Sequence, residues 1–500
     1  MTCRWSLAVM AVLLSAPPGC ARLDHRPGPG NVDGKVEPAG YRPAPTPRHR
    51  EPMATTDLIP IPPELSGPQP VDAYIRRALD ENRTVQAAVH NVRSLEHRIP
   101  QVTALDDPTA SNTVFPIPSV APQYSLMGYN PYNLTLAQQF PWCGTLRVRG
   151  QVAARDVEVA LAELAAAQLD AVSAVKRAYF DLYANQKTGT ILAENRQILE
   201  IFRERAASRL EAGGTQQDVL RAEVLIGELD RELANTSAGI ATARAALARQ
   251  LHIGPEADLR TLPEIPTADV PTQVDRLYRL AVAARPELKG RLAAVARDEG
   301  AVELARKRSY PNVTLGLTYM DMEKTNAATP KSASGFPNVG LFVGFNLPVN
   351  RAKYRAGVGE AQERALADAK LYEAQKDDTY GEIHDFMVQA RVQQDVLGLL
   401  RDRILPRSEQ ALELAGKDYA ASNVDLPTVL SAEREVLQLR IQIAQVEGEL
   451  GKALAMLERA VGGQINEHPP VPPSTGTAGP PATGPPPSPG PERAKEAAPR

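Results

Sequence analysis

The chain has 500 residues, with 56 lysine and arginine residues against 59 acidic ones, and a formal net charge of −3. This balance gives no basic field for nucleic acid. Three cysteines, Cys3, Cys20 and Cys143, are too few and too scattered for a disulfide framework or a zinc site. Aromatic residues make up only 5% of the chain, which favours long, closely packed helices over a thick globular core.

The first twenty residues, 1–20, are typical of an export signal, with Arg4 in the charged start and an apolar stretch from Leu7 to Leu14. Eight apolar residues are too few to span a hydrocarbon core of roughly 30 Å. The segment is similar to a bacterial lipoprotein signal, in which Cys20 becomes the lipid anchor of the mature chain. Two prolines shortly before Cys20 depart from that pattern. The alternative is an ordinary cleavage site nearby, with Cys20 incidental.

Two proline-rich segments frame the rest of the chain. Residues 21–69 are rich in proline and glycine and predict an extended leader. Residues 464–500 consist mostly of proline, glycine, alanine, serine and threonine, which cannot fill a hydrophobic core, so we expect a disordered tail. The body between them divides into a first repeat at 70–262 and a second repeat at 271–463.

The division follows from a duplication. The stretch VDAYIRRAL at residues 71–79 recurs as VDRLYRLAV at 274–282, an offset of 203. The stretch DVLRAE at 218–223 recurs as TVLSAE at 428–433, an offset of 210. A period this long indicates two copies of a half-protein and not a solenoid of short units.

Each repeat predicts a helix, a strand, a hairpin loop, a strand, a very long helix, a tight turn and a returning helix. The region from Leu146 to Glu211 lacks proline, and its apolar residues keep the spacing of a coiled-coil seam. About 66 residues at a rise of 1.5 Å make a rod of about 100 Å. Its counterpart runs from Arg351 to Ala421, with a kink expected at Pro406. The returning helices are expected at 215–251 and 425–460.

The turn at the end of each rod has its own chemistry. In the first turn we expect Gly213 to set the backbone shape and Thr215 to cap the returning helix, with Asp218 as the acid of a capping box. In the second turn Asn423 tolerates the left-handed conformation and Asp425 is the expected cap.

Four stretches alternate apolar residues with small or polar ones, as strands with one apolar face do. They lie at 109–115, 132–140, 313–319 and 339–347. Such strands suit either a soluble sheet with one wet face or a lipid-facing, water-lined barrel. Four strands have no helix face or second sheet to pack on here, and four cannot close a barrel, so copies of the chain must share one. The residues expected to face lipid are Leu134, Leu136, Val313, Leu315, Leu317, Leu341, Val343 and Phe345.

Taken together, these features mean that the chain resembles the TolC-like outer-membrane efflux proteins. The resemblance covers residues 70–463. Besides the duplication and the DVLRAE turn, it rests on ALDEN at 78–82 and on two strand-to-helix junctions, QQFPWCGTLR at 138–147 and NLPVN at 346–350. The junctions are most similar to those of heavy-metal exporters of the cobalt-zinc-cadmium type.

The resemblance implies a mostly helical fold with a small transmembrane β part. Three copies form a helical tunnel through the periplasm and a twelve-stranded β-barrel in outer-membrane lipid, with four strands from each chain. The resemblance also implies docking onto a periplasmic membrane-fusion adaptor and an inner-membrane pump of the RND type. The conduit is passive and needs neither an enzyme site nor a cofactor. Its expected cargo is heavy-metal cations, with drugs as the alternative.

By the same resemblance, the hairpin tips contact the adaptor and form the aperture. The apolar contacts are expected from Leu220 and Leu430. Relatives narrow the aperture with acidic rings, and the matching positions here are Thr428 and Ser431, so Asp218 and Asp425 are the substitute candidates. For each residue the alternative role is to cap a helix or fill the coil seam. The full set of tip residues is Gly213, Thr215, Asp218, Leu220, Asn423, Asp425, Leu430, Thr428 and Ser431.

No enzyme is predicted, because the chain has no HExxH, GxSxG, Walker or GxGxxG motif. The seven histidines are dispersed, so no metal site is predicted either. The competing function is a secreted coiled-coil spacer, which would share the rods but not the paired alternating strands. A periplasmic adaptor fits less well, since it has one helical hairpin and no duplication.

Overall fold

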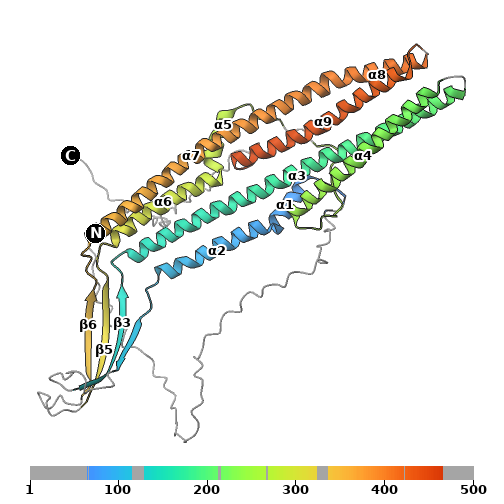
Figure 1. The fold of residues 1–500 in the computed structure, drawn as a ribbon. Helices are drawn as coiled ribbons and strands as arrows, with labels where there is room; N and C mark the ends of the chain where they lie inside the picture. The colour runs from blue at the N-terminus through green and yellow to red at the C-terminus, as the bar shows by residue number, and fades with distance from the viewer. Residues whose placement is uncertain are drawn as a thin grey trace, which may run out of the picture.

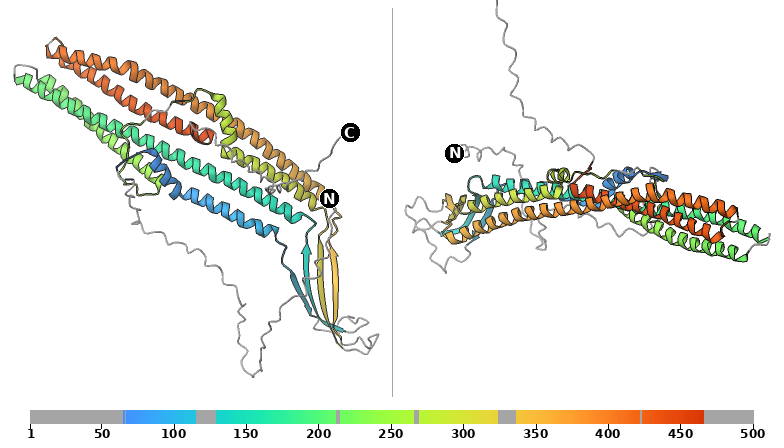
Figure 2. Two further views of the ribbon diagram at one scale, coloured as in Figure 1. Left: turned by 180° about the vertical axis from the view of Figure 1, so that it is seen from behind. Right: turned by 90° about the horizontal axis from the view of Figure 1, so that it is seen from above.

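The computed structural model describes residues 65, 67–114, 129–211, 215–265, 269–323, 336–421 and 423–465. It shows an elongated bundle of helices with a β-sheet projecting from one end and two helix-hairpin tips at the other (Figure 1). Seen from above, the bundle is narrow and gently curved (Figure 2). The predicted export signal, Cys20, Gly213 and the tail from residue 466 onward lie outside the described residues.

The first repeat follows the predicted order. It comprises α1 (Val71–Glu81), α2 (Arg83–Thr103), β2 (Thr109–Val114), β3 (Tyr129–Phe140), α3 (Thr145–Glu211) and α4 (Gln216–Leu251). The prediction of a single uninterrupted rod is confirmed by α3, which has 67 residues.

The second repeat has the same order. It comprises α5 (Val274–Ala284), α6 (Pro286–Lys307), β5 (Val313–Glu323), β6 (Asn338–Phe345), α7 (Arg351–Gly398), the π-helical η5 (Leu399–Ile404), α8 (Leu405–Ala420) and α9 (Leu426–Val461). The offsets between equivalent helices equal those of the sequence, 203 for α1 and α5 and 210 for α4 and α9. The prediction of a duplicated fold is confirmed.

The opening helix of each repeat is two helices and not the single one predicted. In the first repeat Asn82 is extended, and its Oδ1 accepts hydrogen bonds from the backbone N–H groups of Thr84 (2.9 Å) and Val85 (3.2 Å). In the second repeat Arg285 takes nearly the same backbone angles before Pro286, which begins α6. A residue before proline is disfavoured in a helix, and an asparagine cap starts a new one, so both sequences break the chain at the same place.

The kink predicted at Pro406 takes the form of a π-helical turn. Residues Leu399–Ile404 widen into η5 just before α8, and Pro406 lies in the first turn of α8. Proline lacks the N–H of a regular helix and its ring crowds the preceding turn, so a wider turn accommodates it.

The structure contains a short parallel pair that the sequence analysis did not predict. Strand β1 (Gly67–Gln69) pairs with β4 (Leu259–Thr261). The Tyr179 hydroxyl donates to the carbonyl of Gln69 at 3.0 Å, and the Tyr74 hydroxyl donates to that of Arg260 at 2.9 Å. The end of the segment assigned to the leader is therefore part of the folded body. At the other end, Ile465 is buried two residues beyond the predicted limit of the second repeat.

The apolar core is a series of clusters along the bundle. One joins α1, α3 and α4 around Tyr74, Tyr179 and Leu251. A second, near the tips, contains side chains of both repeats, including Leu199 and Val429. The two repeats therefore pack against each other along their length. None of the described helices combines the length and the apolar character that a membrane span needs.

Candidate functional site

The four longer strands form one antiparallel sheet in the order β2-β3-β5-β6. Its register brings the apolar positions of neighbouring strands side by side: Leu136 lies opposite Leu317, which lies opposite Leu341. Likewise Leu315 lies opposite Val343. Because side chains alternate between faces, this register collects the apolar residues on one face of the sheet.

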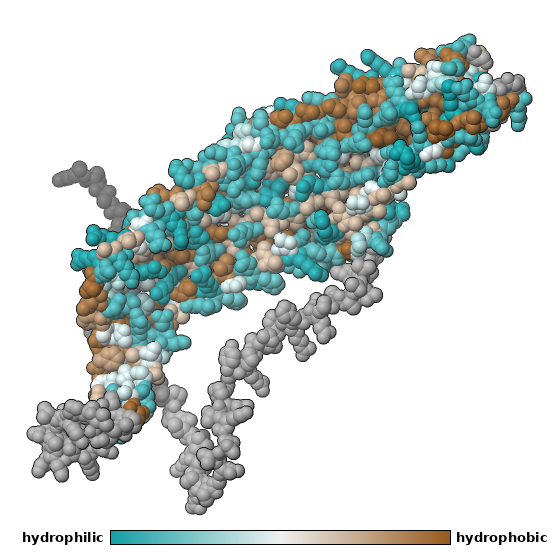
Figure 3. Space-filling view, in the orientation of Figure 1, coloured by the Kyte–Doolittle hydropathy of each residue, from teal (hydrophilic) through white to brown (hydrophobic). Residues whose placement is uncertain are grey.

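This apolar face is uncovered in the single chain. Leu341 is 83% exposed and Val343 64% exposed, whereas large aliphatic side chains are normally buried. Of the residues predicted to face lipid, Leu134, Leu136, Leu315, Leu317, Leu341, Val343 and Phe345 are exposed and Val313 is half-buried. A contiguous apolar surface of this kind indicates contact with another apolar phase or partner. Figure 3 shows one side of the sheet, where hydrophobic residues lie among paler ones.

The opposite face of the sheet carries small and polar residues. Thr135 and Thr318 are paired across the strands, with their hydroxyl oxygens 3.2 Å apart. On the same face Gly316 lies opposite Phe342, and a Cβ on Gly316 would come within 2.0 Å of the Phe342 ring. Glycine is therefore required here because the aromatic ring lies over the neighbouring strand. Among the described strands, β2 and β6 each have one unpaired edge.

At the far end of the molecule, each tip turn is held by a threonine–aspartate hydrogen bond. The Thr215 hydroxyl donates to Asp218 Oδ2 at 3.0 Å, and the Thr428 hydroxyl donates to Asp425 Oδ1 at 2.6 Å. Thr215 and Asp425 are the N-cap residues of α4 and α9, so the predicted cap positions are confirmed. Each side chain is engaged by the side chain three residues later and does not make the standard capping bond. The hydrogen bond from Thr428 lowers the pKa of Asp425.

Asn423 lies just after α8, at the start of the second tip turn. The Asn423 N–H donates to the carbonyl of Asp418 at 2.8 Å, which closes the end of α8. Gly213, the other residue expected to set the turn, lies outside the described residues.

Beside the tips, a groove lies between α4 and α9. Leu220 and Val224 form an exposed apolar rim, at 52% and 62% exposure, and Arg434 and Glu228 form an ion pair along it. Leu430 is only 5% exposed and lies at the floor of the groove. Leu220 thus offers the surface that was predicted, whereas Leu430 faces the core since it belongs to the apolar cluster near the tips. The surface near the tips is visibly hydrophobic in Figure 3.

A contact between the rods near the tips was not found from the sequence. Arg209 of α3 donates to the carbonyl oxygen of Tyr419 in α8 at 2.8 Å, and its guanidinium lies 3.9 Å from the centre of the Tyr419 ring. No local pattern could have revealed it, because the two residues are 210 positions apart.

A buried carboxyl group lies further along the same interface. Glu433 of α9 is 5% exposed and accepts a hydrogen bond from the Asn195 amide of α3. Burial raises the pKa of Glu433. The sequence does contain a signal for it, since Glu433 occupies an apolar slot between Val429 and Val436, both buried.

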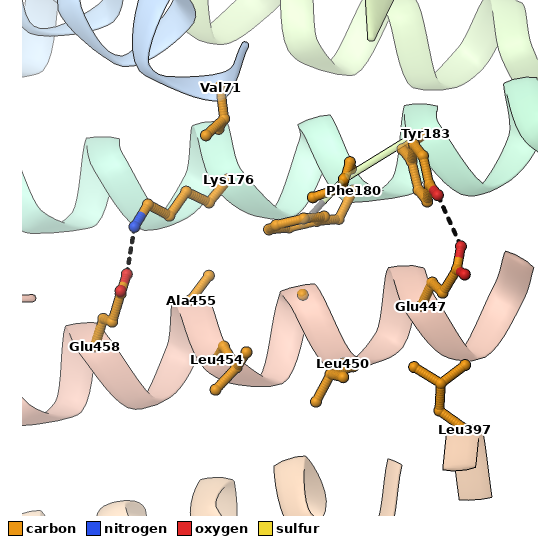
Figure 4. Close-up of a pocket in the computed structure, with 12 residues that line it drawn as sticks. Val71, Lys176, Phe180, Tyr183, Leu397, Glu447, Leu450, Leu454, Ala455 and Glu458 are labelled. Atoms are coloured by element: carbon orange, nitrogen blue, oxygen red, sulfur yellow. Dashed lines mark hydrogen bonds and ion pairs between the residues drawn. The ribbon is translucent and has the colours of Figure 1, made fainter. Parts of the chain in front are cut away.

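Midway along the bundle, α3 and α9 enclose a cavity of about 240 Å³ (Figure 4). Lys176 and Glu458 form an ion pair at one end. At the other end the Tyr183 hydroxyl donates to Glu447 at 2.7 Å. Phe180 lies between them (Figure 4), facing the surface of α9. This contact joins the long rod of the first repeat to the returning helix of the second.

The carboxylate of Glu447 is the centre of this contact. It also accepts from Lys187 at 2.7 Å and pairs with Arg401 of η5. Burial alone would raise the pKa of Glu447, but the hydrogen bonds from Lys187 and Tyr183 outweigh it, and the pKa is lowered. Burial and the neighbouring carboxylate raise the pKa of Tyr183. In the described part of the chain, no group of three or more histidine, cysteine, aspartate or glutamate residues could hold a metal ion.

Comparisons with known proteins match this architecture. The family model described as outer membrane efflux protein matches residues 277–463. The chain is 24% identical over 418 residues to the cobalt-zinc-cadmium resistance protein CzcC of Cupriavidus metallidurans, covering 81% of this chain and 93% of CzcC. The second repeat, from residue 277 onward, therefore matches the outer membrane efflux protein family.

Other proteins similar to this chain agree. The chain is 25% identical over 345 residues to the pyoverdine export outer membrane protein OpmQ of Pseudomonas putida, covering 66% of this chain and 70% of OpmQ. The solved structure of CusC, described in terms of transmembrane channel formation, superposes with a TM-score of 0.64 at 17% identity, covering 81% of this chain and 97% of CusC. The chain therefore has the fold of these outer-membrane channels.

Proposed function

We propose that this chain is the outer-membrane channel subunit of a tripartite efflux system. Three copies would join at the unpaired edges of β2 and β6 and close one barrel, with the apolar sheet face toward lipid. The observation that carries the proposal is this face, which is continuous in register and on which no other described element of the chain packs. In lipid, an open sheet edge is not tolerated, so closure requires other copies.

The conduit acts passively. The polar face of the sheet, with Thr135, Thr318 and Gly316, would line a water-filled interior that continues between the rods. Transport energy comes from an inner-membrane pump, and the protein performs no bond chemistry. The tips close the periplasmic end, where Asp218, Asp425, Thr428 and Ser431 stand as the aperture candidates.

The tip groove is the proposed docking surface for the periplasmic adaptor. Leu220 and Val224 provide exposed apolar contacts, and the Glu228–Arg434 ion pair lies beside them. Thr215 and Asn423 belong to the same surface as residues that hold the turns. Gly213 remains in the proposal as a turn residue, and Cys20 remains the proposed lipid anchor.

The proposed cargo is heavy-metal cations. This follows the printed name of CzcC, a cobalt-zinc-cadmium resistance protein that aligns with most of the chain. The second candidate is an organic solute, since OpmQ is named for pyoverdine export. Deleting the gene and testing resistance to cobalt, zinc and cadmium beside export of organic compounds separates the two.

The test of the channel itself is fractionation. Membranes carrying the full chain are extracted with detergent and run on SDS gels with and without heating. Trimers that dissociate only on heating, found in the outer-membrane fraction, are expected. A monomeric chain that stays in buffer without detergent would support the secreted spacer and contradict the channel.

A further inference from the structure

Where the helices meet the sheet, the chain carries a band of positive charge. We define the junction band as segments 141–150, 303–312 and 346–355, which join β3 to α3, α6 to β5 and β6 to α7. The band contains one carboxylate, Glu303, although the chain as a whole has more acidic than basic residues. The fourth junction, from α2 to β2, adds Asp106 and Asp107, so the four junctions together carry eight cations against three carboxylates. The basic residues of the band are Arg147, Arg149, Arg306, Lys307, Arg308, Arg351, Lys353 and Arg355.

These cations have little compensation within the described part of the chain. Lys307 pairs with Glu303 at 3.7 Å, and the other seven form no ion pair with any described carboxylate. Most of them are exposed, including Arg306, Arg308 and Arg351. Most of the positive charge in the band is therefore exposed in the single chain and is not neutralised by described carboxylates. Lys307 also donates a hydrogen bond to the carbonyl of Cys143 at 3.4 Å.

Three of the cations, Arg147, Arg351 and Lys353, lie in the first turns of helices, where the helix disfavours them. Arg306 and Lys307 instead lie in the last turn of α6, where a helix favours cations. Helices α3 and α7 begin in the band, have no acidic residue in their first turns, and carry Arg147 and Lys353 there. A helix N-terminus bears partial positive charge, so cations at that end are destabilising and anions are favoured. In contrast, α4 and α5 have Asp218 and Asp275 in their first turns. An external anion would relieve the repulsion in the band.

The band follows directly on the apolar sheet face. Trp142 and Tyr310 are exposed and stacked, with ring centroids 5.0 Å apart, at the level of the junctions. Beyond the end of β6, Leu347 and Val349 are 69% and 84% exposed. A protein surface in a bilayer presents apolar residues to the hydrocarbon, aromatic rings to the interface and cations to the phosphates. The sheet and the junction band follow this order.

We propose that the junction band binds the phosphate headgroups of anionic phospholipids in the periplasmic leaflet of the outer membrane. The proposal rests on the proposed function, since it requires the sheet to lie in lipid. Arginine matches a phosphate with two parallel hydrogen bonds, which suits the predominance of arginine over lysine in the band. Headgroup binding on this ring of residues fixes how deeply the sheet sits in the bilayer.

Trp142 provides a local probe. The chain has two tryptophans, and Trp5 lies in the predicted export signal, so in a Trp5→Phe background all tryptophan emission comes from the junction band. The full protein is purified as trimers and reconstituted into phosphatidylcholine vesicles containing phosphatidylglycerol. Either the neutral or the anionic lipid carries brominated acyl chains, which quench tryptophan at short range. The ratio of quenching gives the preference for anionic lipid beside Trp142.

We expect a preference of threefold or more for phosphatidylglycerol, which falls toward one in high salt because the cations are exposed. The variant R306Q/R308Q/R351Q should lose the preference. The control R205Q/R403Q/R407Q removes three exposed arginines on the rods, far from the sheet, and should keep it.

The outcomes separate the two proposals. If both brominated lipids quench Trp142 equally, the sheet lies in lipid but the headgroup inference is overturned. The cations would then face the water-filled interior or bind an acidic protein. A preference that survives the band variant also overturns it. If neither brominated lipid quenches Trp142, the sheet does not lie in lipid and the proposed function itself fails.

Discussion

Arg209 of α3 and Tyr419 of α8 are joined twice, by a 2.8 Å hydrogen bond to the backbone carbonyl and by the guanidinium over the ring at 3.9 Å. The contact links the rods of the two repeats just before the tips. A cation over an aromatic ring and a charged hydrogen bond each contribute about 1–2 kcal/mol. If the proposed channel opens by separation of its tips, this contact must break, so the contact favours the closed form.

Replacing Arg209 with alanine removes both interactions, about 2–4 kcal/mol together, and is therefore expected to shift the tips toward the open form by about thirtyfold or more. The measurement is single-channel conductance in planar bilayers, which should rise in mean value or open time. Arg205→Ala, one turn away and exposed, is the control and should leave the conductance unchanged. If both variants behave like the parent, the Arg209 contact does not restrain the tips.

The buried Glu433 should make the stability of the protein depend on pH. Its pKa is raised in the folded protein, so folding favours the protonated carboxyl, and this contribution to stability is lost as the pH rises from 4.5 through the folded pKa. Glu433→Gln keeps an acceptor for Asn195 without the charge. The variant should unfold a few degrees higher than the parent at pH 8, and the difference should disappear near pH 4. Thermal melts in detergent across this range provide the measurement, and a variant less stable at pH 8 would contradict the assignment.

The pKa of Glu447 is shifted in the opposite direction to that of Glu433. Its pKa is lowered in the folded protein, so its contribution is present above pH 4.5 and is lost as the pH falls through the folded pKa. Glu447→Gln leaves Lys187 and Arg401 without their carboxylate and should destabilise the protein at pH 7. Breaking a buried ion pair costs about 3–5 kcal/mol of folding stability. Because Lys187 is partly exposed, we expect a loss at the lower end of this range. Denaturant titrations should show a smaller loss of stability at pH 4 than at pH 7. An equal loss at both pH values would mean that Glu447 stabilises the protein through packing and not through its charge.

Gly451 tests the packing of the two repeats at the α3–α9 contact. A Cβ at this position would come within 2.4 Å of the Phe180 ring. Gly451→Ala is therefore expected to destabilise the protein by about 1–3 kcal/mol through overpacking. Gly416→Ala in α8 has open space and should be neutral or stabilising by up to about 1 kcal/mol. Adding Phe180→Leu should recover part of the loss, and a neutral Gly451→Ala would mean that α3 and α9 do not pack this closely.

Much of the fold could be predicted because it depends on local patterns. The rod from Leu146 to Glu211 follows from the absence of proline and a regular apolar spacing, and α3 matches it. The apolar face of the sheet follows from alternation within each strand, and the register of Leu136, Leu317 and Leu341 aligns its residues. A duplication strengthens such predictions, because each repeat provides an independent copy of the same pattern.

The details that could not be predicted concern competition between alternatives of similar energy. Thr215 and Asp425 lie at helix caps, but a side-chain partner three residues away satisfies each of them in the structure. The sequence alone could not show whether each side chain would bond a backbone N–H group or the side chain three residues away. Pairs such as Asn195 with Glu433 depend on how two distant helices pack, and a single sequence contains no record of that distance.

The most direct test of the account is the location of the two faces of β6. In a background lacking Cys143, single cysteines are placed at Leu341 on the apolar face and at Gly340 on the polar face, and membranes are treated with a water-soluble maleimide. The account predicts rapid labelling of the Gly340→Cys protein and protection of the Leu341→Cys protein until detergent is added. Equal labelling of both positions in intact membranes would contradict a lipid-facing sheet and, with it, the channel.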